Sequence, residues 1–201
     1  MGEVYDALIQ RLGNPEKIEF NGEVLLLFKS KEQPLSSILM TSGLSDIAMN
    51  THEKHVDEAH KELYFMLPSY WEIHDLNNPK FNWVLHWLIR LKNYVIANKT
   101  WLGHGHTMPC GKDMKALSET MLQNHFIISR PIVLANDLAP IQLIDREIGF
   151  LAVIPIFGDE MDFKQGKGTV KFFRKLEGAK ISEKLDDFRK TALRAKWRFF
   201  G

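Results

Sequence analysis

IGFLAVIPIF (residues 148–157) decides the fold, because it is apolar almost without interruption. A strand with one solvated face alternates apolar and polar residues, whereas a strand that is covered on both faces is apolar throughout. The stretch is also far shorter than the roughly 20 residues that cross a bilayer. It therefore predicts a central strand whose sheet carries secondary structure on each side.

Other strand-sized apolar segments lie before it in the chain. They are EVLLLFKS (23–30), SSILMTSG (36–43), HKELYFMLPSYW (60–71) and QNHFIISRP (123–131). Polar residues separate them, and Pro68 closes the third, since proline cannot donate to a central ladder. We expect these segments to form one sheet with the 148–157 strand.

Four segments have helical spacing instead. GEVYDALIQRLGNPE (2–16) repeats Val4, Leu8 and Leu12, and FNWVLHWLIRLKNYVIAN (81–98) is the clearest helix of the sequence. Residues 159–178 read as a helix interrupted by glycines, and residues 181–201 as a helix that begins at a Ser182 cap. The predicted architecture is one α+β domain, residues 1–201, with a mixed and mainly antiparallel sheet and flanking helices. Its motif-bearing core spans about residues 24–178, and 179–201 is a basic C-terminal helix or tail.

Composition and charge narrow the class of protein. The chain is 45% hydrophobic and 25% charged, which is typical of a globular domain, and its single cysteine allows no intrachain disulfide. No signal peptide or membrane span is recognisable, so we expect a soluble, cytoplasmic protein. Residues 162–201 hold 12 Lys or Arg and 5 Asp or Glu, a net +7. This basic segment could meet nucleic acid or an acidic protein, or could be a solvated helix face.

NKTWLGHGHTMPCG (98–111) looks most like a reactive site. His104, His106 and Cys110 have the donor types that bind zinc, and Cys110 beside a histidine could be a nucleophile. The competing interpretation is structural: the glycines allow bends while the histidines hydrogen-bond the loop. That interpretation predicts a largely buried, hydrogen-bonded His106 and no metal. THEKHVDEAHKE (51–62) lacks the four-residue histidine spacing of a zinc helix, which indicates a polar, solvated connection.

Three blocks together resemble the suppressor of fused domain. They are ELYFMLPSYW (62–71), WLIRLKNYVIANKTWLGHGHTMP (87–109) and FLAVIPIFGDEMDFKQGKGTVKFFRKL (150–176). The signature loop of the resemblance contains Trp101, Gly103, Gly105, His106, Thr107 and Pro109. The resemblance implies an α+β fold without known catalytic activity. The larger animal protein of this family is a cytoplasmic inhibitor that clamps a peptide of Gli-type transcription factors between two lobes. This chain resembles one lobe, so Gli binding is not carried over.

Small stand-alone relatives are bacterial, and some are thought to be immunity proteins that act beside secreted toxins. The resemblance thus favours a non-enzymatic protein-binding module without a cofactor, whose partner is another protein such as a toxin encoded nearby. It implies no membrane and no small-molecule substrate. Lys196, Trp197, Arg198 and Phe199 are candidate partner contacts, as an aromatic and basic patch. Two alternatives stay open: a metal-dependent hydrolase using His104, His106 and Cys110, and nucleic-acid binding through the basic segment.

Overall fold

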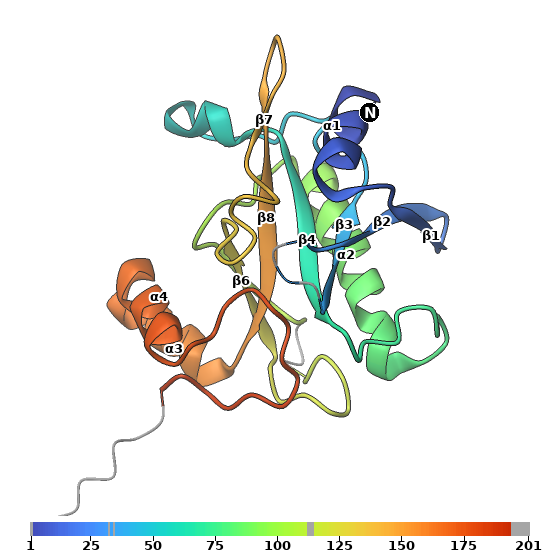
Figure 1. Cartoon of the computed structure of the whole chain (residues 1–201). Helices are drawn as coiled ribbons and strands as arrows, with labels where there is room; N and C mark the ends of the chain where they lie inside the picture. Colours follow the sequence, from blue (N-terminus) through green and yellow to red (C-terminus); the bar gives the residue numbers. More distant parts are fainter. Residues whose placement is uncertain (1, 32, 34, 112–114, 194–201) are drawn as a thin grey trace, which may run out of the picture.

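The computed structural model describes residues 2–31, 33, 35–111 and 115–193. These residues form an eight-stranded sheet with helices on both faces (Figure 1). The strands are β1 (Glu16–Phe20), β2 (Glu23–Lys29), β3 (Ser36–Thr41), β4 (Lys61–Pro68), β5 (Thr107–Pro109), β6 (His125–Ser129), β7 (Ile141–Gln142) and β8 (Glu147–Ile156). The helices are α1 (Gly2–Leu12), the 3-10 helix η1 (Glu53–Glu58), α2 (Pro79–Ala97), α3 (Gly158–Lys167) and α4 (Thr169–Gly178). The predicted single α+β domain with a mixed, mainly antiparallel sheet is confirmed.

The strands lie in the order β1-β2-β3-β4-β8-β6-β5, and β7 pairs with β8 outside this path. β4 and β8 lie next to each other at the centre and run parallel, while each pairs antiparallel with its other neighbour. Every residue of β4 is buried, and so is every residue of β8 after Glu147. The apolar run at 148–157 is thus a central strand, as its composition predicts.

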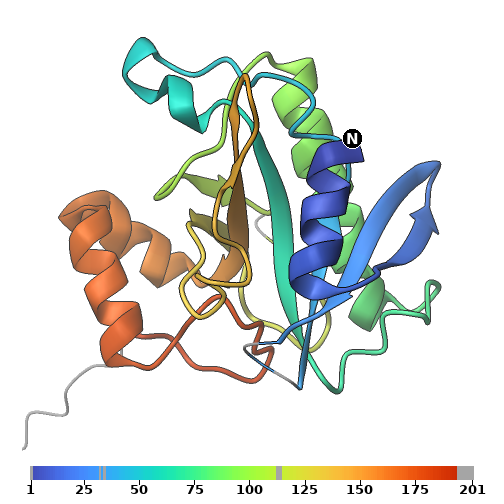
Figure 2. The same cartoon turned by 45° about the horizontal axis from the view of Figure 1, so that its top comes forward.

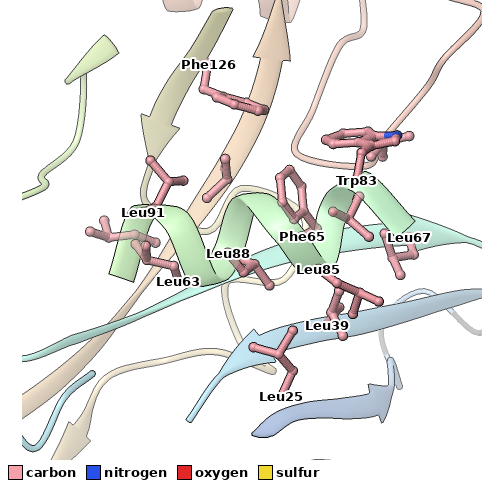
Figure 3. Packing of buried hydrophobic residues seen from close by; sticks show 14 of the residues in the cluster. Leu25, Leu39, Leu63, Phe65, Leu67, Trp83, Leu85, Leu88, Leu91 and Phe126 are labelled. Carbon is pink, nitrogen blue, oxygen red and sulfur yellow. The ribbon is translucent and has the colours of Figure 1, made fainter. Parts of the chain in front are cut away.

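Helix α2 covers one face of the sheet. Its Trp83, Leu85, Leu88 and Leu91 pack against a row of β4 side chains, Leu63, Phe65 and Leu67 (Figure 3). Phe126 of β6 joins this core, with its ring centroid 6.0 Å from that of Phe65. The helix begins cleanly because Asn78 Oδ1 accepts the Lys80 N–H at 3.1 Å and Pro79 starts the first turn.

Helices α1, α3 and α4 lie on the opposite face (Figure 2). Tyr64 and Met66, which alternate with the α2-facing residues of β4, point into this second core. Helix α1 contributes Val4, Leu8 and Leu12, and helix α4 contributes Phe172 and Leu176. The two cores explain why the central strands have no solvated face.

The expected helix over residues 181–201 is wrong for the part that the structure describes. Residues 179–193, here called the C-terminal strap, contain no helix and run across the end of β4 (Figure 1). Lys184 forms a parallel bridge with Met66, and the Leu185 N–H donates to the Met66 carbonyl at 2.9 Å. Residues 194–201 lie outside the described part of the chain. Pairing with the sheet therefore overrides the helical spacing of the strap.

A buried carboxylate holds the start of the strap. Glu183 is 2% exposed, and its Oε1 accepts the N–H groups of Ile132, Val133 and Leu134 at 2.8, 2.8 and 3.1 Å. These three amides belong to the turn that follows β6. Glu183 thereby ties the strap to this turn and satisfies three backbone donors at once.

A second buried carboxylate holds the end of the strap. The Arg189 guanidinium donates to both carboxylate oxygens of Glu160 in α3, at 2.8 and 2.7 Å. The side chains of Arg189 and Glu160 are 7% and 0% exposed. Two parallel hydrogen bonds are the strong form of such a pair, and burial makes the loss of one partner costly.

We predict that Arg189→Met lowers the free energy of unfolding by about 3 kcal/mol, because it leaves the Glu160 carboxylate buried without its cation. Urea denaturation followed by circular dichroism measures this loss. Lys190→Met removes a neighbouring exposed charge and should change stability by less than about 0.5 kcal/mol. An Arg189→Met protein as stable as the Lys190→Met protein would refute the structural role of the pair.

Candidate functional site

The loop that follows α2, residues 98–106, is built around Trp101. The Trp101 ring folds back over Gly103, where an added Cβ would lie 2.4 Å from Trp101 Cζ3. A side chain at position 103 would therefore push the indole away. The glycine is required by this close approach of the ring.

Gly105 is required for two reasons. Its φ is +86°, a conformation that side chains disfavour, and an added Cβ would lie 2.7 Å from Thr169 Cγ2 at the start of α4. Its N–H donates to the Ile128 carbonyl at 2.8 Å, and the Ile128 N–H donates to the His106 carbonyl at 2.8 Å. Contacts with β6 and α4 therefore hold the loop in place just before β5 begins.

The two loop histidines lie against aromatic rings. His104 stacks on Phe173 of α4 with a centroid distance of 4.5 Å, and its Nδ1 accepts the Arg130 N–H at 3.3 Å. His106 lies edge-on to Trp101 at 4.4 Å. Partial burial lowers the pKa of both imidazoles below the usual value, and the nearby Arg130 charge lowers that of His104 further. A hydrogen bond with the Trp101 backbone opposes the shift at His106. The His106 side chain was expected to be largely buried, but the structure shows it only half-buried.

Cys110 follows β5 and packs against the core on the α2 side. Its N–H donates to the Asn124 carbonyl at 3.0 Å. Burial raises the pKa of the Cys110 thiol to about 12, although the Arg90 charge opposes the shift. The thiol is therefore protonated at neutral pH, and a thiol is a much weaker nucleophile and metal ligand than a thiolate.

The structure does not bring His104, His106 and Cys110 together as ligands. Among the described residues, no group of three or more His, Cys, Asp or Glu side chains is arranged to hold a metal ion. Thr107 and Pro109 lie in β5, where they pair with Ile127 and His125 of β6. The arrangement of these residues is that of a structural junction between α2, the sheet edge and α4.

The segment before β4, expected to be a solvated connection, is a 3-10 helix that packs on this loop. Its residues are solvent-accessible, yet His55 stacks on Trp101 with a centroid distance of 5.1 Å. Glu58 forms an ion pair with the Arg130 guanidinium, and its other oxygen lies 3.7 Å from Lys61 Nζ. Burial alone would raise the pKa of Glu58, but the Arg130 hydrogen bond and the two positive charges together lower it.

Sequence reasoning missed the two charged residues that begin β4. Lys61 and Glu62 are 6% and 3% exposed, although they close a polar segment in the sequence. Glu62 accepts hydrogen bonds from Thr41 Oγ1, Gly43 N and Ser45 in the loop after β3. Two charges at the start of an otherwise apolar segment were the available signal, because such positions lie at the edge of a core.

The other predicted contacts fall on or near the C-terminus. Lys167, Lys171, Arg174 and Lys175 of the basic segment are exposed on α3 and α4. The candidate partner contacts Lys196, Trp197, Arg198 and Phe199 lie outside the described residues. In the described part of the chain, no helix has the length and apolarity needed to cross a membrane.

Solved structures with this fold identify what the chain is similar to. A chain in the crystal structure of the Sufu–Fu complex is 16% identical, with a TM-score of 0.67 and coverage of 95% of this chain and 91% of that one. A suppressor of fused homologue from Neisseria gonorrhoeae is 12% identical, with a TM-score of 0.62 and coverage of 97% and 100%. Drosophila Suppressor of Fused is 15% identical, with a TM-score of 0.65, and this chain covers 50% of its length.

These structural likenesses concern the fold, and a family-level sequence match goes further. A search of curated proteins found no significant sequence match. The suppressor of fused protein (SUFU) family matches residues 23–190, which include every element from β2 to α4 and most of the C-terminal strap. The chain therefore belongs to the suppressor of fused protein family.

Proposed function

We propose that the chain is a non-catalytic protein-binding module of the small bacterial stand-alone type. In this proposal it works in the cytoplasm as an immunity protein, and it neutralises a cognate toxin by binding it one to one. The observation that carries the proposal is the family match over residues 23–190. One relative with the same fold was solved as a Sufu–Fu complex, which supports a protein as the partner class.

The geometry of the signature loop supports the absence of catalysis. A catalytic cysteine needs a lowered thiol pKa and a base within hydrogen-bond reach. Here the Cys110 thiol has a raised pKa, and the imidazoles of His104 and His106 are engaged with Phe173 and Trp101. The residues that looked reactive in the sequence thus have structural contacts that account for them.

Stoichiometric neutralisation is the first expected outcome. When the toxin encoded by the neighbouring gene is titrated with this protein, its activity should fall linearly and reach zero at a one-to-one ratio. Size-exclusion chromatography with light scattering should show a complex of one copy of each. Loss of toxin activity at strongly substoichiometric amounts would instead indicate catalysis, and the lack of any complex would refute the proposed partner.

An inert Cys110 is the second expected outcome. At pH 8 the folded protein should react with iodoacetamide at least about 100-fold more slowly than the urea-unfolded chain, because the raised pKa leaves little thiolate. Mass spectrometry measures the rate without ambiguity, since the chain has one cysteine. Cys110→Ala should neutralise the partner as well as the unchanged protein does. Fast alkylation of the folded protein, or loss of function in a Cys110→Ala protein that circular dichroism shows to be folded, would contradict the inert role of the thiol.

A further inference from the structure

A pocket with a volume of about 560 Å³ lies between η1, the turn after β6 and the start of β8. In Figures 1 and 2, η1 and the β7–β8 hairpin project side by side above this end of the sheet. The apolar part of the pocket lining comes from the turn after β6 and from β8: Pro131, Ala135, Leu138, Pro140, Phe150 and Leu151. A volume of this size suits a small ligand or the last residues of a peptide.

Lys61 lies in the polar wall of this pocket, and the fold makes room for it. The parallel pairing of β4 and β8 sets Lys61 opposite Gly149. A Cβ on Gly149 would lie 2.5 Å from Lys61 Nζ and 2.8 Å from its Cδ. A glycine inside a strand weakens the strand and often marks a close approach. Here that approach is the lysine side chain, which is 7% exposed.

The Lys61 ammonium is only partly compensated. Its Nζ donates to the Asp57 carbonyl at 3.2 Å, and this is its one hydrogen bond within the described residues. The Glu58 carboxylate is more distant, at 3.7 Å, and it also pairs with Arg130. An ammonium has three protons to donate, and a buried charge needs close partners. The pocket therefore offers an unused cationic donor at its wall.

The Lys61 ammonium, with its nearest carboxylate at 3.7 Å, favours a ligand with a single negative charge. The pocket lining holds three cations, Lys54, Lys61 and Arg130, and three anions, Asp57, Glu58 and Glu147, so its net charge is zero and the preference for an anion rests on Lys61 alone. Arg130 uses Nη2 for Glu58, and its side chain, which also lines the pocket, is 68% exposed. Lys54 and Asp57 are exposed and of opposite sign, and the Glu147 carboxylate accepts a hydrogen bond from the neutral Gln142 amide and keeps its charge.

We propose that this pocket binds a carboxylate attached to an apolar group, with Lys61 and Arg130 holding the carboxylate and the accessible Pro131, Ala135 and Pro140 holding the apolar group. Two sources share this chemistry, a free organic acid and the C-terminal residue of a protein. The site is separate from the signature loop, and its function does not depend on the immunity proposal. Lys61 is a binding residue here, with no step of covalent chemistry assigned to it.

The test uses calorimetric titration and ¹H–¹⁵N NMR of the whole chain with four probes. These are 4-phenylbutyrate, its neutral amide, and the peptide acetyl-Ala-Ala-Phe with either a free or an amidated C-terminus. We expect at least one of the two acids to bind at millimolar concentration or better, and its amide to bind at least about tenfold more weakly. Binding of both acids would assign the pocket to organic acids generally, whereas binding of the peptide acid alone would assign it to protein C-termini.

Variants locate the binding. Lys61→Met should weaken binding of the acid at least about tenfold, because it removes a charge-assisted hydrogen bond. Lys180→Met, which removes an exposed lysine outside the pocket lining, is the matched control and should bind normally.

A second pair of variants does not depend on a buried substitution. Ala135→Phe adds bulk to an exposed position of the lining and should block binding, whereas Asn136→Phe adds the same bulk next to it and should not. Equal binding of acid and amide, unchanged binding by Lys61→Met and Ala135→Phe, or no binding by any probe would each overturn the proposal. Any of these results would leave the toxin titration above unaffected.

Discussion

The parallel pairing of β4 with β8 is the constraint on which the rest of the structure depends. In this register Lys61 lies opposite Gly149 and Tyr64 lies opposite Ala152. Two adjacent strands without a solvated face require a cover on both sides, and α2 covers one side while α1 and α4 cover the other. The same register brings a buried lysine over a glycine at one end of the pair, which is where the proposed carboxylate pocket lies.

The other end of the pair is closed by polar groups. The pairing of β4 with β8 ends at Tyr64, and the C-terminal strap bridges to β4 at Met66. Two buried carboxylates fix the strap: Glu183 binds three backbone amides, and Glu160 binds Arg189. Neither interaction is local in the sequence. The signature loop also connects separate elements of the fold. At the sheet edge, Trp101 and the glycines join α2 to β5 and α4.

The sequence predicted the elements whose cause is local. The apolar run at 148–157, the spacing of Val4, Leu8 and Leu12, and the 81–98 helix each carry their own hydrophobic pattern, and the structure has the corresponding elements. The prediction of a helix in the strap was wrong. Leu185 and its neighbours have helical spacing, yet the element that decides their conformation is β4, which lies more than 100 residues earlier in the chain. Lys61 and Gly149 could not be connected for the same reason: no local pattern sets the register of two strands so far apart. His104, His106 and Cys110 suggested a reactive site because the types of donor atom can be read from a sequence. The ring contacts of the two histidines and the burial of the cysteine depend on the tertiary structure and cannot be read from it.

Native-state hydrogen exchange tests the central place of the β4–β8 pair most directly. If the pair is the constraint on which the fold depends, the amides of Leu63, Tyr64, Leu151 and Ala152 exchange only through global unfolding, with the free energy found by denaturation. The amides of the edge strands β1 and β5 should exchange through smaller openings. Exchange of the β4 and β8 amides that is as fast as exchange at these edges would contradict the account.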